Sequence, residues 1–243
     1  LPVVLESHSP EIAADHDDLL LIGLTEDASI SPFDLAVSGD LGEQMLLWEF
    51  ATAVASRLLG INPFDQPDVE AAKVAAHSML EATKTEKSPA MEQIKSYGFA
   101  LAGTTLESAI DSFIRLALPN SYFSIQCYLN RLELAEASGL RDLLAVSTNR
   151  PTTFGWGPRF LHSTGQYHKG GPKQGLFLQI LSAEELDLEI PGRPFSYKEL
   201  IDSQALGDAK VLESRGLKVL SLRLPNVREG LQAISSILGK REN

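Results

Sequence analysis

The sequence predicts an α/β fold, a three-layer αβα sandwich on a mostly parallel, doubly wound sheet of five strands. Short apolar runs alternate with longer amphipathic segments, which is the pattern of β-α units. At 243 residues and 44% hydrophobic content, the chain can bury one large core. No stretch rich in Gly, Ser or Pro divides the sequence, so we expect a single domain over residues 1–243.

Five apolar runs of strand length are bounded by turn residues. They lie at 18–24, 122–129, 152–156, 176–181 and 218–224. Segments of helical length and pattern lie at 42–59, 67–83, 106–118, 132–146, 197–215 and 227–238. Apolar residues surround most of 42–59, so we expect this helix to be buried on more than one side. Segment 84–102 fits neither pattern, and we expect a surface excursion there.

The composition argues against nucleic-acid binding and membrane spanning, and it favours one cellular compartment. The net charge is −11 and the pI is near 4.9. Nucleic-acid binding requires a positive surface that neutralises phosphates, so this charge argues against it. No run of about 18 uncharged apolar residues occurs, so we expect no contact with a membrane interior. The single cysteine, Cys127, cannot form an internal disulfide, and the N-terminus lacks the layout of a secretion signal, which favours a cytoplasmic location. The sequence begins without Met, and we expect a fragment of a longer protein.

The first segment with chemical potential is a predicted helix-loop-helix corner. Gly60 ends one helix, Pro67 begins the next, and Asp65 is placed to cap the free amides of the second helix. Lys73 then lies about two turns into that helix, where its ammonium group can reach back toward a cleft, while Gln66 stays in the loop. The alternative is a structural corner with a solvated lysine.

The second such segment, residues 155–172, directly follows a predicted strand. It is dense in glycine, proline, histidine, basic and hydroxyl residues, which a protein core would exclude. Backbone amides near Gly165, together with Ser163 and Thr164, can hold an anion. His162 supplies an imidazole, the side chain suited to proton transfer at neutral pH. The alternative is a structural loop whose histidine satisfies a carbonyl group.

Three other motifs argue against further chemistry. Thr104 and Glu107 have the spacing of a capping box for the helix that begins at 106, so this stretch is not a phosphate loop. His162 and His168 lie six residues apart without a carboxylate at ligand spacing, so we expect no metal site. Phe160 stands where a dinucleotide-binding loop needs its third glycine, and we expect no cofactor.

Two stretches resemble the glucose-6-phosphate isomerase family. The run Leu-Gly-Ile-Asn-Pro-Phe-Asp-Gln-Pro at 59–67, followed by Lys73, is similar to the family's C-terminal signature, and Leu-Trp-Glu-Phe at 47–50 resembles the preceding helix. Leu-His-Ser-Thr-Gly-Gln at 161–166 is similar to the family's histidine loop. Because this loop follows the signature, the order most resembles the C-terminal sugar-isomerase (SIS-type) domain of fused transaldolase/glucose-6-phosphate isomerase proteins.

The resemblance implies a metal-free aldose-ketose isomerase that converts glucose 6-phosphate to fructose 6-phosphate. It implies that Lys73 and His162 are catalytic and help to open the sugar ring. It also implies substrate contacts from the side chains of Gln66, Ser163, Thr164 and Gln166. The resemblance is also compatible with a homodimer.

The sequence departs from the family at points that matter for catalysis. Asp68 replaces the usual glycine of the signature, and neither the catalytic glutamate motif nor the phosphate loop of the first domain is recognisable. We therefore expect an upstream isomerase domain, with a fused transaldolase domain as a further partner, and weak activity from this fragment alone. The alternative function is a non-catalytic sugar-phosphate-binding module with a regulatory or scaffold role.

Overall fold

In the computed structural model, the chain divides into two compact units. The larger unit comprises Leu1–Glu11 and Gln66–Asn243, and the smaller comprises Ile12–Asp65. The residues that the structure describes are 2–14, 19–25, 33–65, 70, 73–78, 80, 93–183 and 187–241.

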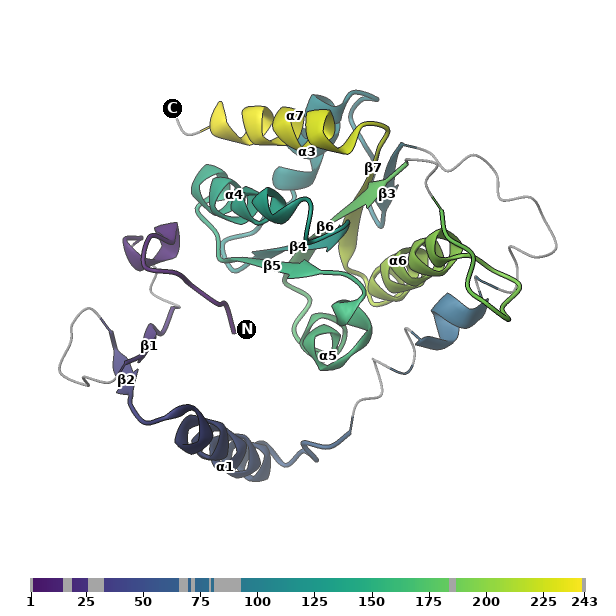
Figure 1. The fold of residues 1–243 in the computed structure, drawn as a ribbon. Coiled ribbons are helices and arrows are strands. Elements are labelled where there is room, and N and C mark those ends of the chain that lie inside the picture. The colour runs from purple at the N-terminus through teal and green to yellow at the C-terminus, as the bar shows by residue number, and fades with distance from the viewer. Residues whose placement is uncertain are drawn as a thin grey trace. The chain divides into compact units, whose positions relative to one another are not determined.

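A five-stranded sheet forms the centre of the larger unit (Figure 1). Its strands are β3 (Ile94–Tyr97), β4 (Tyr122–Tyr128), β5 (Thr152–Trp156), β6 (Gly175–Ser182) and β7 (Lys218–Leu224). They lie in the order β3-β7-β6-β4-β5. The neighbours β5, β4, β6 and β7 run parallel to one another, and β3 pairs with β7 in the antiparallel direction.

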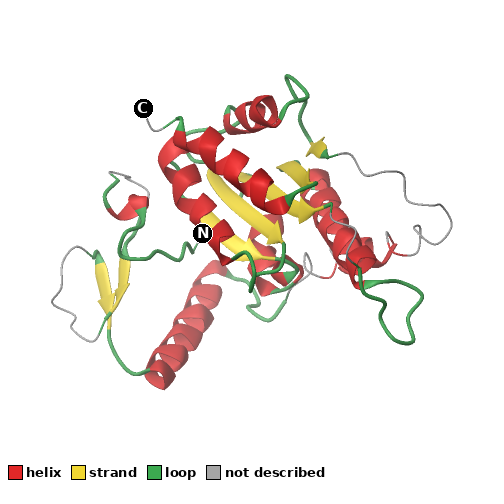
Figure 2. Cartoon of the chain, turned by 45° about the horizontal axis from the view of Figure 1, so that its top comes forward, coloured by secondary structure: helices red, strands yellow, loops and turns green. Residues whose placement is uncertain are grey.

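Helices cover both faces of this sheet, as Figures 1 and 2 show. On one face lie α3 (Leu106–Ile114), η2 (Ala135–Gly139), α4 (Leu140–Thr148) and α7 (Val227–Gly239). On the other lie η3 (Arg159–Leu161), α5 (Ser163–Gly170) and α6 (Tyr197–Ser214). The alternation of β4 explains the arrangement, because Phe123, Ile125 and Cys127 join the core under α3 and α7 while Tyr122 and Tyr128 face α5 and α6. The predicted three-layer αβα sandwich is confirmed.

The fifth strand of the sheet differs from the prediction. Four of the five predicted strands enter the sheet, but of 18–24 only β1 (Ile22–Leu24) is a strand, and it pairs with β2 (Leu35–Val37) in the smaller unit. The fifth position is filled by β3, from within the segment expected to be a surface excursion. As a short edge strand that carries Lys95 and is only half buried, β3 lacks the apolar run that marks an internal strand.

The predicted helices 197–215 and 227–238 agree with α6 and α7 to within one residue, but predicted 132–146 begins well before α4, because η2 occupies 135–139. α3 begins at residue 106 as expected, but the capping box pairs Thr105 with Ser108 instead of Thr104 with Glu107. The Ser108 amide donates to the Thr105 hydroxyl, and the Ser108 hydroxyl accepts from the Thr105 amide, both at 3.1 Å. A serine therefore takes the role that the sequence pattern assigned to a glutamate. Of the predicted helix at 67–83, residues 73–78 are helical and parts of the remainder lie outside the described residues.

In the smaller unit, α1 (Leu41–Leu59) begins at a capping box between Asp40 and Glu43 and ends at Gly60, which has a φ of 70°. Both ends agree with the sequence, since a left-handed residue that closes a helix favours glycine. The predicted burial of this helix is wrong, because Ser56 is its only buried residue. Among the described residues of its own unit, the only sheet is the small β1-β2 pair, which is too little to cover 19 residues. Within the described residues, no helix has the length and apolar character needed to cross a membrane.

Candidate functional site

Segment 155–172, expected to be a loop, folds mostly as η3 followed by α5. His162 occupies the N-cap of α5 with an extended backbone (φ −123°), and its side chain is exposed. The segment leaves the sheet at the carboxyl end of β5, the edge at which parallel sheets usually bind ligands. His162 is therefore accessible and lies at the start of a helix, where free backbone amides favour an anionic group.

A buried ion pair holds this segment against α6. The Lys169 ammonium lies 2.6 Å from the Oδ1 atom of Asp208, and neither side chain has any exposed surface. Lys169 also donates a hydrogen bond of 2.7 Å to the carbonyl of Phe160 in η3. A Cβ on Gly165 would lie 1.9 Å from that same carbonyl oxygen, so only glycine lets the chain turn this tightly. Residues 160–169 thus fold around one ammonium group.

Polar side chains on the sheet face beneath α6 lie near the Lys169–Asp208 pair. Gln179 Nε2 donates to the Oε1 atom of Gln126 at 3.0 Å and to the carbonyl of Ala205 at 3.1 Å. Burial raises the pKa of Asp208, and the nearby Lys169 and Gln126 side chains partly oppose this rise. Burial, together with the charge of Asp208, raises the pKa of Tyr128 well above its ordinary value. Tyr128 is therefore neutral, and its hydroxyl lies in the same buried layer as the carboxylate.

The helical segment 73–78 packs on the same helix, α6. Ala75 packs against the apolar cluster that Leu161 forms with Val211 of α6. A Cβ on Gly207 would lie 2.7 Å from the backbone nitrogen of Ala76, so this glycine allows the two helical backbones to approach closely. Leu161 immediately precedes His162 and Ala75 follows Lys73 by two residues, so the chain next to His162 and the chain next to Lys73 both pack on α6.

The structure gives different amounts of information on the predicted site residues. Lys73 is about half exposed and forms a surface ion pair of 2.7 Å with Glu70, which is weak in water. Gln166 is partly buried in α5. Ser163 and Thr164 are the first residues of α5, but their side chains lie outside the described part, as does Gln66. The substrate contacts of these four residues stay predictions.

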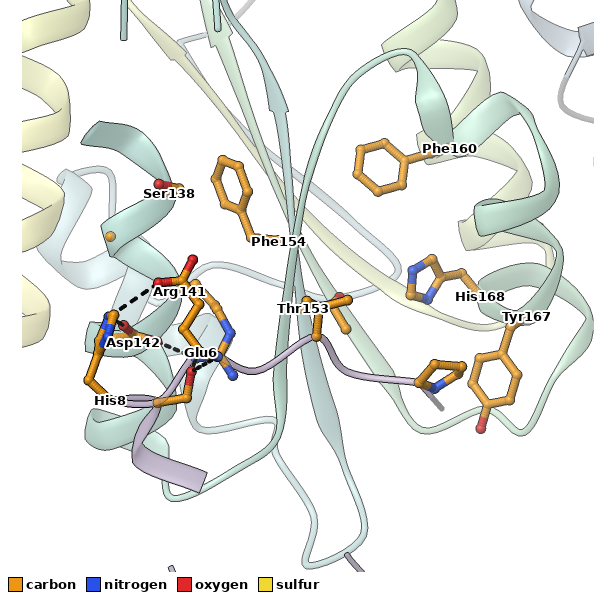
Figure 3. Close-up of a pocket in the computed structure, with 14 residues that line it drawn as sticks. Glu6, His8, Ser138, Arg141, Asp142, Thr153, Phe154, Phe160, Tyr167 and His168 are labelled. Atoms are coloured by element: carbon orange, nitrogen blue, oxygen red, sulfur yellow. Dashed lines mark hydrogen bonds and ion pairs between the residues drawn. The ribbon is translucent and has the colours of Figure 1, made fainter. Parts of the chain in front are cut away.

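A cavity of about 680 Å³ lies beside the edge strand β5 (Figure 3). Glu6, His8, Arg141 and Asp142 line one side, Thr153 and Phe154 the middle, and Phe160, Tyr167 and His168 the other side. The polar groups on the first side contact one another: the His8 ring lies 3.6 Å from Glu6 and 3.7 Å from Asp142, and Arg141 forms an ion pair with Asp142. Neither His162 nor Lys73 lines this cavity.

His168 is a buried histidine with a defined partner. Its Nδ1 atom lies 2.9 Å from the hydroxyl of Tyr122, and the two rings stack. Burial, with a further contribution from the Lys169 charge, lowers the pKa of His168 to about 4, and burial raises that of Tyr122. Both groups are therefore neutral at pH 7, and Tyr122 can donate its proton to Nδ1. Figure 3 shows the imidazole pointing toward β5.

Several of these residues were missed by sequence reasoning. Asp208 lies inside an ordinary amphipathic helix and carries no local signal. β4, however, has Ser124 and Gln126 inside an apolar run, and polar residues in a buried strand indicate polar partners across the layer. No group of three or more His, Cys, Asp or Glu residues within the described ranges could hold a metal ion.

Comparisons with known proteins give limited matches. No protein-family model matches the chain. A stretch of 46 residues is 44% identical to a protein named probable glucose-6-phosphate isomerase from Methanococcus maripaludis, and it covers 19% of this chain and 10% of that protein. The match therefore spans about a tenth of the length of this curated relative. The crystal structure of a hypothetical protein from Thermus thermophilus superimposes with a TM-score of 0.49 at 16% identity, over 71% of this chain and 43% of that one.

Proposed function

We propose that this chain is the His162- and Lys73-bearing part of a glucose-6-phosphate isomerase, which interconverts glucose 6-phosphate and fructose 6-phosphate. The observation that carries the proposal is one apolar cluster on α6, in which Leu161, immediately before His162, lies with Val211 and Ala75, two residues after Lys73, packs against them. The short match to a protein with that name adds support.

The reaction moves a proton between adjacent carbons through an enediol. It requires opening of the sugar ring, a base at carbon, and neutralisation of the charge that develops on oxygen. In this proposal the His162 imidazole transfers a proton at the sugar oxygens during ring opening, and the Lys73 ammonium stabilises the developing negative charge. Gln66 contacts the phosphate end of the substrate, while Ser163, Thr164 and Gln166 bind the sugar phosphate near the start of α5.

The carbon base is not assigned to a residue of this chain. The proposal places it, with a first phosphate-binding loop, in an upstream domain of the same protein. The activity of the 243-residue chain alone should then be far below that of the full-length protein.

A coupled assay of glucose 6-phosphate turnover tests the catalytic roles in the full-length protein. Loss of a general acid-base group typically lowers kcat by about 10²- to 10⁴-fold, and we expect a fall in that range for His162→Ala. Lys73→Ala should also lower kcat. His77→Ala, at an exposed position on the same helical segment, and Lys240→Ala, at the end of α7, are matched controls that should keep normal turnover. Wild-type rates for His162→Ala and Lys73→Ala would refute the catalytic assignment.

The same preparation separates catalysis from binding alone. A wild-type protein that binds glucose 6-phosphate in calorimetry without turnover would replace the isomerase proposal with a non-catalytic sugar-phosphate module. Competition between glucose 6-phosphate and mannose 6-phosphate in the assay would then show which sugar the site prefers.

A further inference from the structure

Two consecutive residues of α6 hold the two proposed catalytic segments. Gly207 lies under the helical segment 73–78, where a Cβ would come within 2.7 Å of the Ala76 nitrogen. Asp208 pairs with Lys169 on α5 at 2.6 Å. A shift of this turn of α6 would therefore move both segments, and a shift of either contact alone would change their separation.

Burying the Lys169–Asp208 pair carries a desolvation penalty that an apolar contact between the two helices would avoid. Both charges lose their hydration when they are buried, and an apolar pair of similar size is often as stable. The Lys169 ammonium does something that an apolar side chain could not, because it donates to the Phe160 carbonyl at 2.7 Å. Phe160 lies two residues before His162, so the ammonium fixes the backbone that leads into the histidine. An apolar residue at 169 would leave that carbonyl without its donor.

We propose that Lys169 and Asp208 are positioning residues that fix the His162 loop on α6 and thereby set its separation from Lys73. This inference rests on the proposed function, in which His162 and Lys73 act on one substrate. Neither Lys169 nor Asp208 would touch the substrate, since both side chains are fully buried.

A purely stabilising role is the competing explanation, and a double variant separates the two. Asp208→Asn or Lys169→Met alone leaves one buried charge without its partner, which should destabilise the fold. Lys169→Met/Asp208→Asn removes both charges at similar volume and should recover much of that stability. It still lacks the donor to the Phe160 carbonyl. We expect kcat of the double variant to remain about 10- to 100-fold below wild type, because small misplacements of catalytic groups cost that much.

The kinetic pattern is specific to positioning. The KM for the sugar phosphate should stay near the wild-type value while kcat falls, because the binding groups remain and their alignment is lost. Asp202→Asn is the matched control, since Asp202 is also on α6 and also in an ion pair, with Arg223 at 2.8 Å. That variant should keep the wild-type kcat. A double variant that regains both stability and kcat would overturn the proposal.

Amide hydrogen exchange tests whether the Lys169–Asp208 pair holds α5, without relying on activity. In the Asp208→Asn variant, peptides that cover α5 should exchange about tenfold faster, as expected for a local opening, while peptides from α3 on the opposite face of the sheet should be unchanged. Equal acceleration in both regions would mean global destabilisation and would refute positioning. If wild-type protein fails to turn over glucose 6-phosphate, the proposed isomerase function is refuted. The exchange pattern still decides whether the Lys169–Asp208 pair holds α5.

Discussion

Glu11 and Arg141 form a buried ion pair of 2.6 Å across 130 residues of sequence. The same Glu11 oxygen accepts a hydrogen bond of 3.2 Å from the amide of Thr152, the first residue of the edge strand β5. One carboxylate therefore pairs with a cation of α4 and accepts a hydrogen bond from the edge strand of the sheet. The N-terminal segment is thereby fastened beside β5.

Removing this carboxylate should destabilise the larger unit. Breaking a buried pair leaves an uncompensated charge, and we expect Glu11→Ala to lower the free energy of unfolding by about 3 kcal/mol in urea titrations. Glu6→Ala changes an acid in the same segment whose side chain is 78% exposed. Its effect should stay within about 0.5 kcal/mol. Equal effects of the two substitutions would show that the pair contributes little.

His168 should make the fold sensitive to mild acid. Its pKa is about 4 in the folded protein, below the ordinary value of 6.5. Between these values the unfolded chain binds a proton that the folded one does not, so stability falls as the pH drops through this window. A shift of this size corresponds to at most about 3 kcal/mol, fully expressed near pH 4 and absent above pH 7.

Unfolding free energies measured between pH 7 and pH 4 check the sign of this effect. His168→Gln removes the titrating group and keeps a side chain that can bond to the Tyr122 hydroxyl. The difference in stability between wild type and this variant should therefore shrink as the pH falls. A constant difference across the range would show that His168 does not titrate in this window.

Much of the sheet could be predicted because its four parallel strands carry mostly apolar runs of strand length. β5 and β7 begin and end at the predicted residues, since each is bounded by turn residues that the sequence displays. β3 could not be predicted, because its place is set by pairing with β7, more than 100 residues away. Such long-range pairing leaves no local pattern in Ile-Lys-Ser-Tyr.

The candidate site was predictable only in part, for a similar reason. Glycine, histidine and basic residues marked the segment that contains His162 and Lys169. The partner Asp208 is 39 residues beyond Lys169 in a helix of ordinary composition. Nothing local distinguishes an aspartate that enters a core from one that faces water, so its role depends on the packing of α5 against α6.

Gly207 should tolerate no side chain. An added Cβ would meet backbone atoms of Ala76 at 2.7 and 2.8 Å, and backbone cannot rotate away as a side chain can. We expect Gly207→Ala to cost about 1–3 kcal/mol through overpacking and to lower kcat by separating 73–78 from α6. Gly239→Ala is the matched helical control, with nothing within 4 Å of the added carbon. It should be neutral or stabilise by up to about 1 kcal/mol, from helix propensity alone. Similar losses from both variants would contradict close packing at Gly207.

Cys127 should report on opening of the sheet, because it is the only cysteine in the chain. Its side chain has no exposed surface in β4, and burial raises the pKa of its thiol to about 12. Only the thiolate reacts with disulfide reagents, so both effects suppress the reaction in the folded state. We expect negligible labelling by Ellman's reagent in buffer and one thiol per chain in concentrated urea. The labelling rate at intermediate urea should follow the unfolding equilibrium measured by circular dichroism. Rapid stoichiometric labelling without urea would place Cys127 outside the core and contradict the assigned alternation of β4.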